Sequence, residues 1–330
     1  MIDPFGRHIT YLRLSVTDRC DFRCQYCMAE NMTFLPKSEI LSLEELELLC
    51  HVFIRRGIKK IRLTGGEPLV RKNIISLIRH LGEYVHNGEL DELTLTTNGS
   101  QLEKYAADLY AAGMRRINVS LDTLEPELFR TITRWGRLDQ VMQGIRAAKK
   151  AGLSVKINMV ALKGINDTEI DDMLAWCVAE EMDLTLIETM PLGAVNVIRA
   201  DQYLPLAPKL EDLKSRWPLK ASSHSSGGPA RYYTVEGSKT KLGMITPMSH
   251  NFCDSCNRIR LTCTGELYMC LGHDDKVDLR QVLRAYPGDV AQVEEALHNA
   301  ISQKPERHYF IIDPQDDKPT LQRFMNTTGG

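Results

Sequence analysis

The sequence has no excess of either charge and no long hydrophobic run. Its 330 residues include 41 Lys and Arg and 43 Asp and Glu, which give a formal net charge of −2. A protein that binds nucleic acid over a broad surface is usually strongly basic, so we expect no nucleic acid as a partner and only a local site for anions. No apolar stretch approaches the roughly 20 residues of a membrane helix. The first residues show no basic segment followed by an apolar one, which predicts a cytoplasmic protein without membrane contact.

The sequence also lacks an even set of cysteines. An odd number does not pair completely, and disulfides are rare in the reducing cytoplasm, so both facts argue against a disulfide framework. Cys50 and Cys177 fall in helical segments among apolar neighbours and are expected to pack in the core. The other cysteines form two groups and are candidate metal ligands or reactive thiols: Cys20, Cys24, Cys27, Cys253, Cys256, Cys263 and Cys270.

Short β-branched apolar runs alternate with segments of helical periodicity over the first 190 residues. The runs cover residues 11–17, 58–64, 93–97, 115–121, 153–162 and 184–190. In one intervening segment Ser42 and Glu45 form an S-x-x-E capping box, and Gly57 ends the predicted helix. Regular alternation implies parallel strands joined by helical crossovers. Six units favour an incomplete (βα)6 barrel over a full eightfold barrel of about 250 residues, and an open doubly wound sheet is the alternative.

The alternation stops after the sixth run. Residues 222–228, SSHSSGG, are typical of a turn-rich stretch or linker. We therefore expect a partial barrel in residues 1–220 and a C-terminal region in residues 221–330, which carries the second cysteine group on a strand-like segment.

The first cysteine group directly follows the first predicted strand. Cys20, Cys24 and Cys27 lie on one short loop. A structural zinc site needs four closed ligands, whereas three thiolates on one loop suit an iron-sulfur cubane, which has four irons and so keeps one iron open. Zinc binding and unrelated core thiols are the alternatives.

The cysteine triad resembles the radical S-adenosylmethionine (SAM) superfamily when it is taken together with Tyr26 and the Thr64-Gly65-Gly66-Glu67-Pro68 turn. The resemblance implies that SAM binds the open iron of a 4Fe-4S cluster and is cleaved to a 5'-deoxyadenosyl radical. We expect Glu67 to accept a hydrogen bond from an ammonium group. The implied SAM contacts lie at strand ends or in the cluster loop: Tyr26, Gly66, Ser120 and Met190.

The second cysteine group repeats the pattern of three ligands. Cys253, Cys256 and Cys270 would again leave one iron open. Strand alternation places Cys263 on the face of Ile259, away from the arginines at 258 and 260, so we expect Cys263 to pack as a small apolar side chain. A zinc site with four cysteines is the alternative.

The second triad, the Asn257-Arg258-Ile259-Arg260 run and the terminal Gly329-Gly330 together resemble a single radical SAM family, the GTP 3',8-cyclases of molybdenum cofactor biosynthesis. The resemblance implies a lyase with two 4Fe-4S clusters, in which the second cluster binds GTP through its guanine. The radical takes the ribose 3' hydrogen, and the C3' radical adds to guanine C8 to give 3',8-cyclo-7,8-dihydro-GTP. The glycine tail is expected to enter the active site, because glycine passes where side chains would clash.

Basic residues within the predicted strands are unexpected, since parallel strands are usually buried on both faces. Arginine suits bidentate phosphate recognition, and lysine adds a point charge. The chain departs from the family at Thr185, where an arginine is usual, and this puts one phosphate contact in doubt. The implied GTP contacts are Arg13, Arg62, Thr96, Lys156, Arg258, Ile259 and Arg260.

The resemblance also implies partners. These are an electron donor such as flavodoxin or ferredoxin, and cyclic pyranopterin monophosphate synthase as the enzyme that receives the product. We expect a monomer or a homodimer. Two other functions stay open: another radical SAM enzyme with an auxiliary cluster, such as one that modifies a peptide, and a non-catalytic zinc or redox module.

Overall fold

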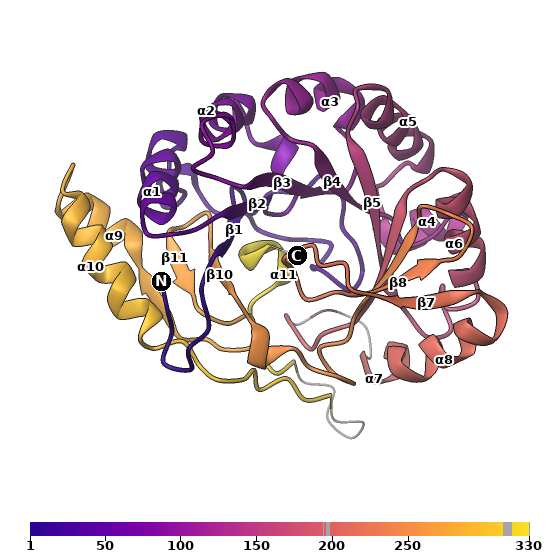
Figure 1. The fold of residues 1–330 in the computed structure, drawn as a ribbon. Coiled ribbons are helices and arrows are strands. Elements are labelled where there is room, and N and C mark those ends of the chain that lie inside the picture. The colour runs from indigo at the N-terminus through magenta and orange to yellow at the C-terminus, as the bar shows by residue number, and fades with distance from the viewer. Residues whose placement is uncertain (194, 196–198, 313–318, 330) are drawn as a thin grey trace.

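The computed structural model describes residues 1–193, 195, 199–312 and 319–329 (Figure 1). Its strands form one mixed sheet in the order β12-β11-β10-β1-β2-β3-β4-β5-β6-β9-β8-β7. The central six strands are parallel: β1 (Tyr11–Ser15), β2 (Lys60–Thr64), β3 (Glu92–Thr97), β4 (Arg116–Ser120), β5 (Ser154–Ala161) and β6 (Asp183–Glu188). The sheet curves around the segment that holds the C-terminus. Because β1 and β6 do not pair with each other, the prediction of an incomplete barrel is confirmed.

Helices cover the outer face of this barrel (Figure 1). The predicted capping box begins α1, since the Glu45 amide donates to the Ser42 hydroxyl at 3.1 Å and the Ser42 amide donates to the Glu45 carboxylate at 2.7 Å. The barrel helices are α1 (Leu43–Arg55), α2 (Ile74–His86), α3 (Leu102–Ala111), α4 (Pro126–Thr133), α5 (Leu138–Lys150), α6 (Ile170–Ala179), α7 (Arg199–Gln202) and α8 (Leu206–Arg216), with 3-10 turns η1 (Lys37–Glu39) and η2 (Pro68–Val70).

The C-terminal region extends both edges of the barrel sheet. At one edge β10 (Arg258–Leu261) pairs in parallel with β1 and is followed by β11 (Glu266–Tyr268) and β12 (Lys276–Asp278). At the other edge β9 (Lys241–Ile245) pairs in parallel with β6 and is followed by β8 (Arg231–Val235) and β7 (Leu219–Ser222). The remaining elements are η3 (Cys253–Ser255), α9 (Leu279–Ala285), α10 (Val290–Ile301) and α11 (Met325–Thr328).

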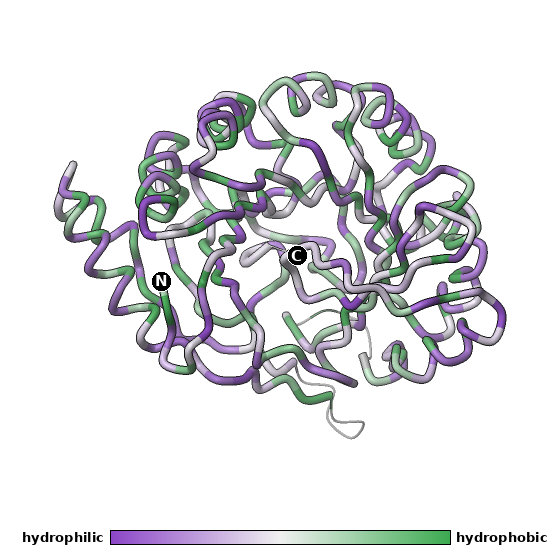
Figure 2. Tube along the Cα trace, in the orientation of Figure 1, coloured by the Kyte–Doolittle hydropathy of each residue, from purple (hydrophilic) through white to green (hydrophobic). Residues whose placement is uncertain are grey.

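Strand residues alternate between an apolar core and a polar barrel interior. Leu12 and Leu14 of β1 are fully buried in the core beneath the helices, whereas Arg13 between them faces the interior and lines a cavity. Figure 2 shows the resulting mixture of hydrophobic and hydrophilic positions along the inner strands. The interior is therefore built to receive polar ligands. None of the helices in the described ranges is both long enough and apolar enough to cross a membrane.

Candidate active site

Two adjoining cavities occupy the barrel interior. The first lies at the carboxyl ends of the strands and encloses about 1130 Å³, including its mouth. The second lies deeper, toward the amino ends, and encloses about 1080 Å³. The two cavities are neighbours, because four residues line both and so lie between them: Asn158, Ile187, Met190 and Met325. Two ligands bound in these cavities would lie next to each other.

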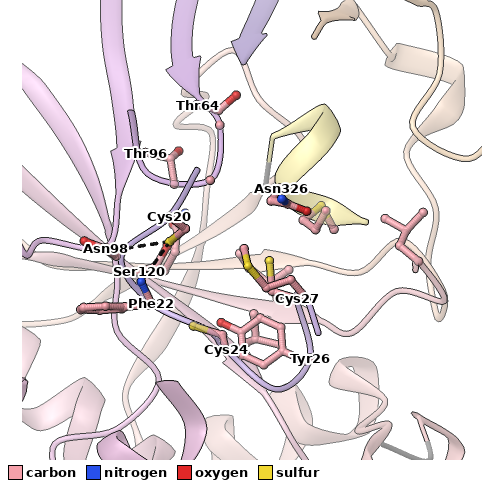
Figure 3. A pocket seen from close by; sticks show the side chains of 18 of the residues that line it. Cys20, Phe22, Cys24, Tyr26, Cys27, Thr64, Thr96, Asn98, Ser120 and Asn326 are labelled. Carbon is pink, nitrogen blue, oxygen red and sulfur yellow. Dashed lines mark hydrogen bonds between the residues drawn. The ribbon is translucent and has the colours of Figure 1, made fainter. Parts of the chain in front are cut away.

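The first cysteine triad lines the first cavity. Figure 3 shows Cys20, Cys24 and Cys27 on the loop that follows β1, with Asn326 of α11 nearby. The loop is closed by the Cys27 amide, which donates to the Cys24 carbonyl at 3.0 Å. Burial raises the pKa of Cys27 to about 12 and that of Cys20 still further. These thiols would ionise only with a bound cation to compensate the charge.

Each triad supplies the three thiolates that an iron-sulfur cubane with one open iron requires. Among the described residues, no three His, Cys, Asp or Glu side chains converge on one metal position. The thiolates of an iron-sulfur cluster each ligate a different iron, so they surround a volume rather than a point. Soft thiolate donors around a buried cavity are the ligand set that such clusters use.

All four implied SAM contacts line the first cavity: Tyr26, Gly66, Ser120 and Met190. The Tyr26 hydroxyl donates to the Asp122 carboxylate at 2.7 Å. Gly66 packs directly against the cysteine loop, and a Cβ there would lie 2.3 Å from the Arg19 carbonyl oxygen. Only glycine allows this approach of the two turns.

Glu67 does not have the position that we expected from the sequence. It is fully buried and is absent from the described lining of the first cavity. Its carboxylate instead accepts hydrogen bonds from the amides of Leu69 and Asn98 and from the Thr97 hydroxyl, at 2.6–3.0 Å. Burial raises its pKa to about 8. Glu67 therefore fastens the turn after β2 to the turn after β3 and is not placed to bind an ammonium group.

The second triad lines the second cavity and is surrounded by basic side chains. The Cys256 sulfur lies 3.7 Å from an Arg258 guanidinium nitrogen and 3.7 Å from the Lys304 ammonium nitrogen. Lys304 is only 2% exposed and also donates to the Arg258 carbonyl at 2.9 Å. Although burial opposes it, Arg258 and Lys304 lower the pKa of Cys256 to about 7. Sequence motifs did not identify Lys304, because its partners lie more than thirty residues away along the chain.

Cys263 lies away from this triad. It is fully buried and is not among the lining residues of the second cavity. Cys50 and Cys177 are fully buried in the hydrophobic core.

Basic residues from neighbouring strands converge in the second cavity. Arg13 of β1 is in register with Arg62 of β2 on one side and with Arg260 of β10 on the other. Burial and the adjacent Arg258 lower the pKa of Arg260 to about 10. The described lining contains no carboxylate, and its arginines and lysine are Arg13, Arg62, Lys156, Arg258 and Arg260. A cavity with this excess of positive charge is a site for a polyanion.

Three residues that the sequence singled out lie apart from this cluster. Thr96 lines the first cavity and not the second. The Ile259 side chain is fully buried in the core, on the opposite face of β10 from the two arginines. Thr185 is also fully buried, and its hydroxyl has no hydrogen-bond partner among the described residues.

The C-terminal tail enters the barrel. The Gly329 carbonyl accepts a hydrogen bond from Arg260 at 2.8 Å, and a Cβ at Gly329 would lie 1.9 Å from the Thr64 hydroxyl oxygen. Asn326 donates to the Asp18 carbonyl at 2.9 Å and lines the first cavity. The predicted position of Gly330 lies outside the described residues. The sequence signalled the tail through its glycines but gave no sign of Asn326 or of Met325.

Comparisons with known proteins identify the family and the fold. Residues 14–177 match the radical SAM superfamily, and residues 182–310 match the family described as Molybdenum Cofactor Synthesis C. A protein of Brucella ovis named GTP 3',8-cyclase is 60% identical over all 330 residues, which cover 96% of its length. A protein of the same name from Rhizobium etli is 61% identical over the whole chain and 94% of its own length. The structure of Streptococcus suis SuiB bound to S-adenosylmethionine shares the fold, with a TM-score of 0.62, 13% identity, and coverage of 97% of this chain and 77% of that one.

Proposed function

The chain belongs to the GTP 3',8-cyclase family of radical SAM enzymes, and from this premise we propose how its own residues cyclise GTP to 3',8-cyclo-7,8-dihydro-GTP in molybdenum cofactor biosynthesis. The observation that carries the proposal is the second cavity, in which five arginine and lysine side chains and three cysteines lie next to the cavity of the first triad, with four lining residues in common.

We assign the first cavity to SAM. Cys20, Cys24 and Cys27 would hold a 4Fe-4S cluster, which supplies the reductive cleavage of SAM to the 5'-deoxyadenosyl radical. Tyr26, Gly66, Ser120 and Met190 would contact SAM. The boundary between the cavities includes the apolar side chains of Ile187, Met190 and Met325. These apolar side chains would exclude water from the boundary between bound SAM and bound GTP.

We assign the second cavity to GTP. Cys253, Cys256 and Cys270 would hold a second 4Fe-4S cluster with an open iron for the guanine. The triphosphate would bind Arg13, Arg62, Lys156, Arg258 and Arg260. Its negative charge would balance the positive charge of these side chains, which no carboxylate in the described lining balances. Thr96 would contact GTP from the neighbouring cavity, and Ile259 through its backbone, since its side chain faces the core. These positions would set the ribose toward the first cavity.

The wider setting is also part of the proposal. The enzyme would be cytoplasmic, would act as a monomer or homodimer, and would receive electrons from a flavodoxin or ferredoxin. Its product would pass to cyclic pyranopterin monophosphate synthase. We keep the division into residues 1–220 and 221–330, with the second cluster in the latter.

Anaerobic reconstitution tests the proposal. Two cubanes predict about eight irons per chain. Reduced protein with SAM and GTP should form 5'-deoxyadenosine and the cyclised nucleotide, which mass spectrometry detects, and omission of GTP should stop nucleotide formation. R62M should lose GTP binding and keep SAM binding. The matched control is K59M, since Lys59 precedes β2 and is exposed, bonded to the Glu89 carbonyl. Release of 5'-deoxyadenosine without any change to GTP would instead favour another substrate.

A further inference from the structure

The segment between β7 and β8, residues 223–230, returns into the barrel. Ser226, Gly228, Pro229 and Ala230 line the second cavity. The Ser226 carbonyl accepts a hydrogen bond from the Lys60 ammonium at 2.5 Å, and the Gly227 carbonyl accepts one from Asn257 at 3.4 Å. Because Lys60 is the first residue of β2, the segment crosses the end of the barrel at which the strands begin.

Tyr232 of β8 connects this segment to a basic residue of β5. Its side chain is 3% exposed, and its hydroxyl donates to the Ser226 hydroxyl at 2.9 Å. The phenol oxygen also accepts a hydrogen bond from the Lys156 ammonium at 3.0 Å. Lys156 lines the second cavity, whereas Tyr232 is not among the described lining residues. Tyr232 would therefore influence a ligand in this cavity only through Lys156 and Ser226.

The fold makes space for the Tyr232 ring. A Cβ at Gly243 of β9 would lie 3.0 Å from a Tyr232 ring carbon and 2.8 Å from the Thr185 hydroxyl oxygen. The absence of a side chain at Gly243 therefore lets the ring pack beside Thr185. The His224 ring packs against the same tyrosine, with ring centroids 4.8 Å apart. The ring is held from several sides, so its hydroxyl has a defined position.

The surroundings of Lys156 explain why a neutral partner matters. Among the described residues, Tyr232 is its one hydrogen-bond partner, and no carboxylate lies within ion-pair distance. Glu92 of β3 forms its described ion pairs with Lys60 and Arg116. Burial and the adjacent Arg62, Arg116 and Lys60 lower the pKa of Lys156, and Asp183 partly opposes them. A phenol fixes the ammonium without cancelling the charge that a polyanion needs.

We propose that Tyr232, held by Ser226, is a positioning residue that fixes the Lys156 ammonium for the triphosphate of GTP. This inference rests on the proposed function of the second cavity. A lysine fixed before binding loses less side-chain entropy when the ligand arrives, so the contribution falls on affinity and not on the chemical step.

Equilibrium binding of GTP to the reconstituted, two-cluster protein tests the inference. Y232F keeps the ring and removes the hydroxyl, and we expect about a tenfold higher Kd and KM for GTP with an unchanged kcat. Binding of guanosine, which has no phosphates, should not change. S226A should weaken GTP binding in the same direction by a smaller factor. Y233F is the matched control, because Tyr233 is the next residue of the strand and is outside the described lining of the cavity. The centroid of its ring lies 5.4 Å from the Lys214 ammonium nitrogen.

The outcomes separate the two levels of the argument. If unaltered protein binds no GTP, the proposed function fails. If it binds GTP and Y232F binds GTP equally well, only the role of Tyr232 fails. A lower kcat with unchanged KM, or equal weakening of guanosine and GTP, would also overturn that role and indicate a structural one. If Y232F does not fold, S226A decides, and its unchanged affinity for GTP would refute the inference.

Discussion

Gly329→Ala should release the C-terminal tail and stop cyclisation. The change places a Cβ 1.9 Å from the Thr64 hydroxyl oxygen, at a backbone φ of +75°. An alanine in this left-handed region costs about 1–2 kcal/mol. Displacement of the tail also removes the Arg260 hydrogen bond to the Gly329 carbonyl, and a bond from a charged donor contributes about 1.5–3 kcal/mol. The total of about 2.5–5 kcal/mol corresponds to a roughly 60- to 4,000-fold fall in the docked tail, and the clash with Thr64 adds to it.

The assay measures cyclised nucleotide and 5'-deoxyadenosine after reconstitution, together with iron content. We expect G329A, and a deletion of Gly329 and Gly330, to keep both clusters and the fold while turnover falls at least a hundredfold. Gly288→Ala is the matched control, because Gly288 has a φ of +80° but no atom within 4 Å of its added Cβ, so it has the backbone strain without the clash. Unchanged turnover in G329A would refute the reasoning, and so would an equal loss in G288A.

Three further predictions concern single side chains. The folded-state pKa of Glu67, about 8, exceeds the unfolded value, so its contribution to stability is complete below about pH 4.5 and is lost as pH rises through 8. Denaturant unfolding of the apoprotein should therefore show a free energy of unfolding that declines across this pH range, and E67Q should lack this decline. The same pH dependence in both proteins would contradict the assignment. Lys304→Met removes the ammonium beside Cys256, so the iron content should fall from about eight toward about four irons per chain. K304R keeps a positive charge and should keep more iron. Full iron content in K304M would show that the ammonium is dispensable. Cys263→Ala should keep about eight irons and cost about 1–2 kcal/mol of stability in denaturant unfolding, because the thiol is buried away from the cavity; loss of the second cluster would support a fourth cysteine ligand.

The sequence predicted the features that short-range patterns encode. Each of the six strands was recognisable as a β-branched run, and each thiolate triad was recognisable by its cysteine spacing. A strand and a triad each span no more than about twenty residues, so a local pattern is enough to identify them. Strand alternation likewise placed Cys263 on the face opposite Arg258 and Arg260, and Cys263 is buried outside the cavity that these arginines line.

Features that depend on distant pairing could not be predicted in this way. From the sequence we expected Glu67 to accept a hydrogen bond from a ligand. Its actual partners, Thr97 and Asn98, are about thirty residues away along the chain, so no local pattern indicated them. Lys304 belongs to no sequence motif. Its role follows from the fold, in which the chain after α10 places Lys304 against Arg258 of β10. The 222–228 stretch had the composition of a linker, and only the hydrogen bonds of Ser226 show that it crosses the barrel.

The pairing of β10 with β1 has a consequence for synthesis and folding. Tyr11 of β1 can pair with Arg258 of β10 only after most of the chain has been synthesised, and β6 can pair only after β9 has been synthesised. Until then a nascent barrel presents two open strand edges, which are templates for aggregation. Pairing over such a span is slow, because a long loop must close before the contacts form. Expression of residues 1–220 alone would make both exposed edges permanent, so a soluble preparation calls for the whole chain.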